Sequence, residues 1–267
     1  MRAYRIADAG RDPLASEGPL ASALWDAGAA GVAEQGTDLV GYFEFAPTVA
    51  LPAGGIWEDV DDVDHVAAYH RALAAVEIGP LVVAPTHREV TLKAGQTVVW
   101  LDPGMAFGTG HHETTRLALE ALAGLDLAGR RVLDVGAGSG LLAIAADRLG
   151  AADAWGLDVD PETVAVARAN ASANRSRARF EAGGFGDVRV APPVDVLVAN
   201  LYAELHAAFL PGYAAVTTPG ADLLLTGILD RRDDLVRDAL AAHAGAFDVV
   251  AWRRDGDWWL VHVRRRG

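Results

Sequence analysis

The chain has 267 residues, of which 51% are hydrophobic and 22% charged, a balance typical of a globular protein with room for two domains. It contains no cysteine, which excludes a disulfide framework and a cysteine-bound zinc site and fits a reducing compartment. The formal net charge of −13 argues against a surface that binds duplex nucleic acid, since each phosphate contact needs a lysine or an arginine.

The N-terminus lacks the apolar core of a signal peptide, and no later apolar run reaches the roughly 18 residues of a membrane helix. We therefore expect a cytoplasmic protein without a membrane segment.

A small α+β domain is predicted over residues 1–56. Hydrophobic periodicity predicts, in order, a strand over 4–7, an amphipathic helix over 14–27 and strands over 31–35 and 39–45. This βαββ order is that of a small α+β module.

A linker helix is predicted over residues 57–77. Two prolines and two glycines between positions 47 and 55 first break the strand pattern, and the acid-rich stretch at 58–64 suits the N-terminal end of a helix dipole. Residues 1–77 hold 13 acidic residues and four arginines, a net charge of −9, which leaves −4 for the other 190 residues. Such an acidic part suits a basic partner, although acidic residues also serve simply to keep a surface soluble.

Strands and helices alternate from about residue 78 to the end. Strands are predicted over 81–84, 97–101, 131–135, 154–158, 178–182, 194–200 and 221–226, and helices over 114–122, 139–149, 161–174, 203–215 and 231–244. This alternation predicts a parallel, doubly wound sheet with helices on both faces. The end of the chain departs from it, because strands over 247–253 and 258–263 flank an Asp-Gly turn, which predicts an antiparallel hairpin.

A glycine-rich turn follows the strand predicted at 131–135. Residues 134–140 read Asp-Val-Gly-Ala-Gly-Ser-Gly, and glycines let the chain turn sharply there and let a ligand approach the backbone. The third glycine of a dinucleotide fingerprint would fall at position 141, where Leu141 stands. A tight glycine-rich turn without any ligand is the alternative interpretation.

Asp158 ends the next predicted strand, 22 residues after Gly136. A carboxylate at this point can accept hydrogen bonds from both ribose hydroxyls of a nucleoside, which predicts a nucleoside ligand but not which one. We interpret Asp160 as structural, because Pro161 follows it and this pair is typical of a helix N-cap and first turn.

A polar loop over residues 102–115 precedes the glycine-rich turn. It reads Asp-Pro-Gly-Met-Ala-Phe-Gly-Thr-Gly-His-His-Glu-Thr-Thr, a composition that favours a loop covering a ligand. Its His-His-Glu run lacks the i, i+4 spacing of a helical zinc pair, so we expect no metal. Thr114 and Thr115 either cap the next helix or present hydroxyl groups to the ligand.

Asn200 stands at the end of the apolar strand predicted at 194–200. Doubly wound folds bind ligands at this carboxyl edge of the sheet, and an amide is costly to bury there without a partner. Asn200 therefore either caps the next helix or faces the site.

The chain resembles the bacterial lysine methyltransferases of large-subunit ribosomal protein eleven. The resemblance rests on the loop at 102–115, the turn at 134–140, Asp158 and the Ala-Asn-Leu-Tyr run at 199–202. It covers essentially the whole chain and implies a class I S-adenosylmethionine-dependent methyltransferase. Its Rossmann-like α/β catalytic domain, a doubly wound sheet ending in an antiparallel hairpin, would span 78–267, and a ferredoxin-like α+β domain over 1–56 would recognise the substrate.

The same resemblance implies roles for single residues. The residues that bind S-adenosyl-L-methionine would be Phe107, Thr115, Asp134, Gly136, Gly138, Asp158 and Asn200. Phe107 would cover the cofactor, Thr115 would contact its methionine part and Asp158 its ribose. Asn200 would lie near the reactive methyl group and would be the catalytic residue. Many members read Thr-His-Pro-Thr-Thr where this chain has His-His-Glu-Thr-Thr, so His111 and Glu113 receive no role.

The implied reaction is methylation of lysine side chains, and of the N-terminal amine, of a basic ribosomal protein by a monomer that needs no nucleic acid. Two alternatives of other classes stay open. One is a nicotinamide-dependent oxidoreductase, against which Leu141 and the terminal hairpin count, since nicotinamide-binding domains normally finish with another parallel strand. The other is a non-catalytic module that keeps the fold. Within methyltransferases, a small-molecule or nucleic-acid acceptor is the alternative, and the acidic N-terminal part favours a basic protein.

Overall fold

The chain divides into two compact units, Met1–Ala68 and Tyr69–Gly267, in a computed structural model. The structure describes residues 2–7, 19–27, 29, 31–35, 37–43, 47, 50–52, 54–59, 75–86, 88–102, 112–187 and 193–267. Within these ranges, each unit has buried core residues of its own. None of the helices described there is long and apolar enough to cross a membrane.

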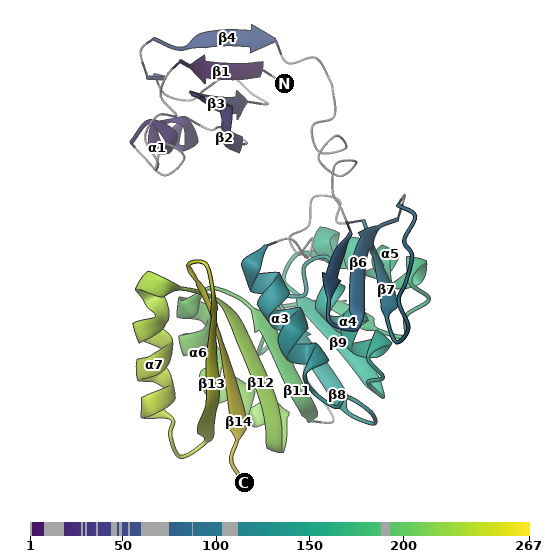
Figure 1. Cartoon of the computed structure of the whole chain (residues 1–267). Helices are drawn as coiled ribbons and strands as arrows, with labels where there is room; N and C mark the ends of the chain where they lie inside the picture. Colours follow the sequence, from purple (N-terminus) through teal and green to yellow (C-terminus); the bar gives the residue numbers. More distant parts are fainter. Residues whose placement is uncertain are drawn as a thin grey trace. The chain divides into compact units, whose positions relative to one another are not determined.

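The N-terminal unit is an antiparallel sheet with one helix. Its described elements are β1 (Arg2–Ile6), α1 (Pro19–Asp26), β2 (Gly31–Gln35), β3 (Asp38–Phe43) and β4 (Ile56–Asp59), and the strands lie in the order β2-β3-β1-β4 (Figure 1). Each neighbouring pair is antiparallel. Because β3 lies between β1 and β2, and β4 adds to the free side of β1, this is the strand order of a split βαβ, and the predicted ferredoxin-like fold is confirmed.

Aromatic packing explains why Trp57 belongs to a strand of this unit. The Trp57 ring meets those of Tyr4 and Phe43 edge-on, with centroids 5.2 and 5.3 Å apart. The Tyr4 hydroxyl also donates to the carbonyl oxygen of Pro52 (2.6 Å) and accepts from the N–H of Gly55 (3.2 Å). These contacts hold the chain that returns to β4 against β1, so the N-terminal module extends through Asp59.

The predicted linker helix over 57–77 is therefore wrong at both ends. Residues 57–59 belong to β4, and Val76–Ile78 forms another strand, β5. The middle of that prediction, residues 60–74, lies outside the described residues, as does the 14–18 part of the helix predicted at 14–27.

The C-terminal unit is built on a seven-stranded sheet with the order β10-β9-β8-β11-β12-β14-β13 (Figure 1). Its strands are β8 (Arg131–Val135), β9 (Asp153–Asp158), β10 (Arg179–Ala182), β11 (Val194–Asn200), β12 (Thr217–Leu229), β13 (Phe247–Asp255) and β14 (Trp258–Arg265). The first five strands in this spatial order pair in parallel, whereas β14 is antiparallel to both β12 and β13. The predicted doubly wound sheet with a terminal antiparallel hairpin is confirmed.

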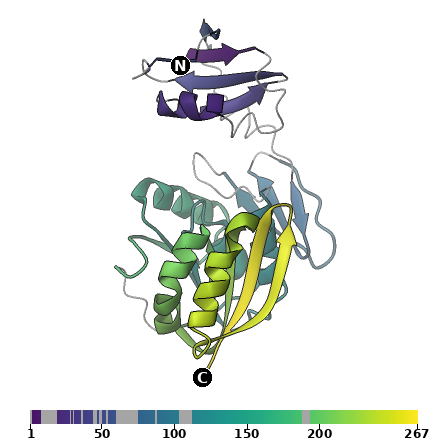
Figure 2. The ribbon, with the colours of Figure 1, turned by 90° about the vertical axis from the view of Figure 1, so that its left-hand side faces the viewer.

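Side chains that alternate along each strand build two cores, one on each face of the sheet. The helices are α3 (Glu113–Ala123), α4 (Leu141–Arg148), α5 (Pro161–Ala173), α6 (Ala203–Val216) and α7 (Asp233–Ala242), with the 3₁₀ turn η3 (Asp230–Arg232) before α7. On β8, Val132 packs with residues of α3, α4 and α5, whereas Leu133 packs with residues of α6 and α7. Figure 2 shows α6 and α7 side by side on one face. With both faces covered, the parallel strands read as nearly continuous apolar runs.

A separate three-stranded sheet covers the α4 and α5 side. It contains β5, β6 (Leu81–Pro85) and β7 (Thr97–Leu101), with β6 and β7 parallel and β5 antiparallel to β6. The expectation that the two strands near 81 and 97 belong to the main parallel sheet is wrong. The side chain of Asn174, the C-cap residue of α5, accepts from the N–H of Trp100 (2.8 Å) and donates to its carbonyl (2.6 Å). The N–H and carbonyl groups of this residue of β7 thus find their hydrogen-bond partner in a side chain at the end of a helix.

Candidate active site

The turn between β8 and α4 requires glycine at two positions. Gly136 and Gly140 have φ values of 75° and 81°, in the left-handed region that glycine tolerates best. A Cβ on residue 136 would lie 2.6 Å from Cδ2 of Leu201, and a Cβ on residue 140 would lie 2.8 Å from the Phe180 ring. The N–H groups of Gly136 and Ala137 both donate to the carbonyl of Leu157 (2.8 and 2.9 Å), which fixes the turn against the end of β9.

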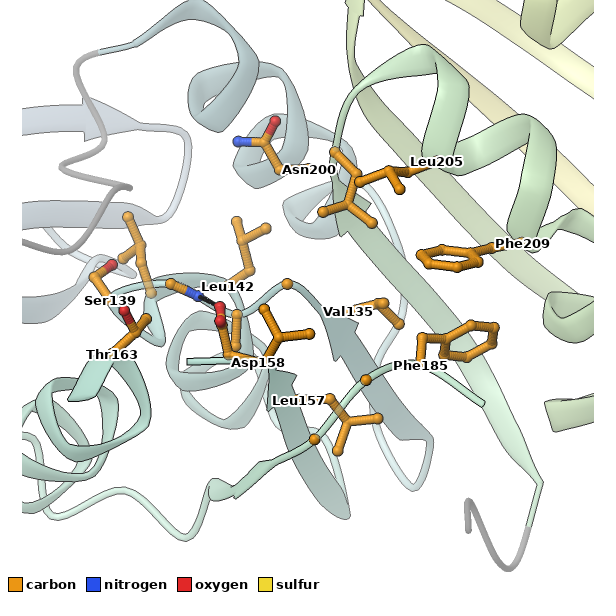
Figure 3. Close-up of a pocket in the computed structure, with 18 of the residues that line it drawn as sticks. Val135, Ser139, Leu142, Leu157, Asp158, Thr163, Phe185, Asn200, Leu205 and Phe209 are labelled. Atoms are coloured by element: carbon orange, nitrogen blue, oxygen red, sulfur yellow. Dashed lines mark hydrogen bonds between the residues drawn. The ribbon is translucent and has the colours of Figure 1, made fainter. Parts of the chain in front are cut away.

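Asp158 lies at the carboxyl end of β9 and faces this turn. Its Oδ2 accepts from the N–H of Gly138 (2.9 Å), and its Oδ1 accepts from the N–H of Asp160 (3.1 Å), as the dashed line and labels of Figure 3 show for the first bond. A carboxylate has about four acceptor positions, so each oxygen can accept a further donor. Asp160 caps α5, accepting from the N–H of Glu162 (2.9 Å), so its structural interpretation is confirmed.

A cavity of about 660 Å³ opens between the turn and the ends of β9 and β11 (Figure 3). Its polar side carries Asp158, Ser139 and Thr163, and its apolar side carries side chains such as Phe185 and Phe209. Four further predicted cofactor residues line it, namely Thr115, Gly136, Gly138 and Asn200. A concave, mostly apolar cavity of this size with a few polar groups is typical of a small-molecule site.

Asn200 points its amide nitrogen toward α3. Its Nδ2 donates to Oγ1 of Thr114 (3.1 Å) and lies 3.5 Å from Oγ1 of Thr115. The Thr114 hydroxyl lies 2.9 Å from Nδ1 of His112, and the Thr114 N–H donates to the same nitrogen (3.3 Å). Because Nδ1 accepts from this N–H, it is an acceptor for the hydroxyl as well, and the Thr114 hydroxyl donates its single proton to it. Oγ1 of Thr114 therefore accepts from Asn200, and the amide oxygen of Asn200 remains as an acceptor for a ligand.

Neither threonine caps the helix, and neither does Asn200. His112 is the N-cap of α3 and Tyr202 that of α6. The sequence left both possibilities open for these residues, and the structure places Thr115 and Asn200 on the cavity wall instead.

A second cavity, of about 430 Å³, meets the first at Asn200. Its described lining residues are His112, Thr114, Asn200, Leu201, Tyr202, Leu205, Gly227 and Trp258. The rings of His112 and Trp258 pack edge-on with centroids 5.2 Å apart, and Tyr202 is 70% exposed at the cavity wall. A Cβ on Gly227 would lie 2.9 Å from Oδ1 of Asn200, so this glycine leaves room for the amide. The walls of the two cavities thus share Asn200, Leu201 and Leu205.

Asp134 is the predicted cofactor residue that does not line either cavity. It is fully buried under the turn, where Oδ2 accepts from the N–H of Ala143 (3.3 Å) and Oδ1 has no hydrogen-bond partner. Burial raises the pKa of Asp134 to about 7, against the hydrogen bond from Ala143. A carboxyl with this pKa is about half ionised at neutral pH, and a cation near it favours the charged form.

Two other features predicted for the site have different outcomes. Phe107 and His111, with the rest of residues 103–111, lie outside the described residues. Across the ranges that the structure does describe, no three His, Cys, Asp or Glu side chains come together as metal ligands would.

The first cavity fits S-adenosylmethionine better than a dinucleotide. Leu141, at the position of the third glycine of the dinucleotide fingerprint, is 1% exposed and packs in the core under the turn. The cavity wall carries the carboxylate of Asp158, apolar side chains, and the polar groups of Thr115 and Asn200. Oδ1 of Asp134 is a buried acceptor without a hydrogen-bond partner beneath the turn.

Comparisons with known proteins point to one family. A family model described as ribosomal protein L11 methyltransferase (PrmA) matches residues 20–266. The ribosomal protein L11 methyltransferase of Deinococcus radiodurans is 49% identical over 255 residues, 91% of this chain and 92% of that protein. That of Thermus thermophilus is 44% identical over 266 residues, 99% and 100% of the two chains. The solved structure of the ribosomal protein L11 methylase from Lactobacillus delbrueckii subsp. bulgaricus is similar with a TM-score of 0.67 and 28% identity, covering 73% of this chain and 100% of that one.

Replacing Asp158 tests the ribose position. We expect Asp158→Ala to weaken S-adenosylmethionine binding by about 2–4 kcal/mol, because hydrogen bonds to a charged group contribute roughly 1.5–3 kcal/mol each. Isothermal titration calorimetry measures this difference directly. Asp160→Ala is the matched control, since Asp160 caps α5 and does not line the cavity, and its affinity should stay at the wild-type value. Equal affinities of wild type and Asp158→Ala would contradict the assignment.

Proposed function

Since the chain belongs to the ribosomal protein L11 methyltransferase family, we propose that it methylates amino groups of ribosomal protein L11, on lysine side chains and at the N-terminal amine. It is a methyltransferase that uses S-adenosylmethionine. The observation that carries the proposal is the meeting of two cavities at Asn200, because methyl transfer requires donor and acceptor to reach one point from opposite sides.

We assign the cofactor to the first cavity, with the ribose at Asp158 and the methionine part near Thr115. When bound, S-adenosylmethionine supplies an electrophilic methyl group on a sulfonium. Gly136 and Gly138 line this cavity without side chains, so their backbone would be open to the ligand. Asp134 acts from below as a buried carboxyl whose charged form a cationic ligand favours.

The acceptor amine enters through the second cavity and has to arrive without its proton. A lysine with a pKa of about 10.4 is neutral roughly once in a thousand molecules near pH 7.4, a cost of about 4 kcal/mol. Among the described residues that line the second cavity, none is a carboxylate that would pair with the ammonium form. The apolar and aromatic wall instead favours the neutral amine by desolvation, and the proton leaves to solvent.

Asn200 orients the neutral amine. Its amide nitrogen is bound to Thr114, so its oxygen faces the cavities and accepts an N–H of the amine. With S-adenosylmethionine bound in the first cavity, the amine lone pair held in this way would face the methyl group that the sulfonium supplies. Collinear positioning of the reacting atoms supplies much of the rate, and no dedicated base is required.

We propose that the acidic N-terminal unit captures the basic protein substrate. Residues 1–77 carry a net charge of −9, and the split βαβ sheet has a core of its own, so it can act as a separate recognition module. Of the described acids, Asp38 and Glu58 are both paired with Arg5 (3.3 and 3.0 Å). We infer from a ribosomal protein substrate that the reaction takes place in the cytoplasm, and we propose that a monomer carries it out without nucleic acid.

Mass spectrometry of purified L11 incubated with the enzyme and S-adenosylmethionine tests the proposed function. We expect mass increments of 14 Da per methyl group on L11 and, after digestion, on lysine-containing and N-terminal peptides. Asn200→Ala should lower the rate by roughly 100-fold while cofactor affinity changes little, because it removes the group that orients the amine. Cofactor binding without any methylation of L11 by the wild type would favour a non-catalytic module or another acceptor, and tight binding of NAD would favour the oxidoreductase.

Separating the two units tests the division of labour. We expect the fragment 69–267 to bind S-adenosylmethionine within about twofold of the full-length affinity and to lose most methylation of L11, because the acidic unit is gone. For the full-length enzyme, kcat/KM for L11 should fall as salt rises from low to physiological concentration. A folded fragment that methylates L11 at the full-length rate would show that residues 1–68 serve only stability.

A further inference from the structure

His206 is a buried histidine beside the site that the mechanism above does not use. It lies in the first turns of α6, six residues after Asn200, and is 0% exposed. Its Nε2 lies 2.8 Å from the carbonyl oxygen of Thr226, and its Nδ1 lies 3.4 Å from the hydroxyl of Tyr213. A fully buried imidazole with a partner on each nitrogen has a defined orientation.

The hydrogen-bond partners of His206 also indicate which ring nitrogen carries the proton. Burial lowers the pKa of His206 to about 4, although hydrogen bonds to the carbonyls of Thr226 and Leu201 oppose that shift. The ring is therefore neutral at physiological pH and has one N–H. Because a carbonyl oxygen only accepts, this N–H must be on Nε2, facing Thr226, and Nδ1 accepts from Tyr213.

Thr226 joins His206 to both sides of the acceptor site. Its carbonyl oxygen also accepts from the N–H of Leu201 (3.0 Å), the residue that follows Asn200. Its hydroxyl lies 3.3 Å from the carbonyl oxygen of Thr114, whose own hydroxyl oxygen accepts from the Asn200 amide. Thr226 thus contacts the backbone beside Asn200 and the helix turn that holds its side chain.

The backbone of β12 at Thr226 and Gly227 has little space on the side of β11. A Cβ on Gly227 would lie 2.5 Å from the Leu201 carbonyl oxygen and 2.9 Å from Oδ1 of Asn200. The ladder between β11 and β12 ends at the pair Asn200 and Thr226, whereas β14 pairs with β12 at Thr226 and again at Ile228 and Leu229, with a register shift between them. The His206 side chain of α6 adds a further restraint at the Thr226 carbonyl.

We propose that neutral His206 is a positioning residue for methyl transfer, which holds Thr226 and, through it, the orientation of the Asn200 amide toward the acceptor amine. The proposal rests on the proposed function of Asn200 and extends it to a residue that touches neither substrate. Tyr213 keeps the ring in the required tautomer and packs on Phe185 and Phe209 of the first cavity, with ring centroids 5.1 and 6.2 Å away. Tyr213 thus links His206 to the wall of the first cavity.

Two polar substitutions separate the bond to Thr226 from burial alone. The amide nitrogen of glutamine reaches the position of the histidine Nε2, whereas that of asparagine reaches only as far as Nδ1. We expect His206→Gln to keep kcat for L11 methylation within about threefold of wild type, and His206→Asn to lower it roughly 10–100-fold, as misplacement of a reacting group does. The Kd for S-adenosylmethionine and the KM for L11 should change by about twofold or less in both variants.

Leu240→Ala is the control for a purely structural role. Leu240 is a buried residue of α7 that lines neither cavity, so this variant lowers Tm without touching the site. Below its melting temperature we expect it to keep the wild-type kcat. The proposal is overturned if His206→Gln and His206→Asn have equal kcat values, or if Leu240→Ala with a matching fall in Tm loses as much activity. A changed pH profile of kcat in His206→Gln also overturns it, because the residue would then transfer a proton.

A measurement without substrate keeps this test separate from the proposed function. Long-range ¹H–¹⁵N NMR of the full chain should show His206 as the neutral Nε2–H tautomer from pH 5.5 to 8. The side-chain amide signal of Asn200 should move in His206→Asn and stay in place in His206→Gln. If the wild type fails to methylate L11, the proposed substrate is wrong, and the Asn200 signal still decides the role of His206: an unmoved signal in His206→Asn contradicts it.

Discussion

The absence of a side chain at position 136 is the constraint on which the rest of the site depends. The order of the parallel strands reverses between β8 and β11, so their connections leave toward opposite sides and a crevice opens at their carboxyl ends. Leu201 closes this crevice to within 2.6 Å of where a Cβ of residue 136 would lie. Any larger residue would displace the Leu201 side chain and would be strained at the φ of 75° that this position adopts. The two cavities meet because the two strand ends can approach this closely.

A second consequence follows for the chemistry at that meeting point. Asn200 is fixed from α3 by Thr114, and its backbone is fixed from β12 by Thr226. Neither restraint involves a charged group, and the second cavity has no carboxylate among its described lining residues. These features support the proposed mechanism, in which the site acts through orientation and desolvation of an amine.

Most of the C-terminal fold was predictable from local pattern, and the failures were all non-local. The strands at 131–135 and 194–200 have the predicted bounds, because an apolar run between turn residues defines them. β4 was missed because Trp57 owes its place to Tyr4 and Phe43, which are far away in sequence. The sequence pattern shows that β6 and β7 are strands but not which sheet they join.

In the site, the glycine-rich turn and the strand end led to Gly136 and Asp158. Asp134 was predicted with them, but side chains alternate between the two faces along β8, and this places the Asp134 side chain on the side of α4. Trp258 had no local signal. Gly227 was also missed, although a glycine that continues an apolar strand could have indicated the bulge found there.

A crystal structure of the chain with S-adenosylhomocysteine bound tests the central claim most directly, because it locates the two ends of the cofactor relative to Asn200. The account predicts both ribose hydroxyls within about 3.2 Å of the Asp158 carboxylate, the range of a hydrogen bond. It predicts the sulfur at the boundary of the two cavities, facing Asn200 and open to the cavity that Tyr202 and Trp258 line. A ligand whose ribose lies away from Asp158, or whose sulfur faces away from the second cavity, would contradict it.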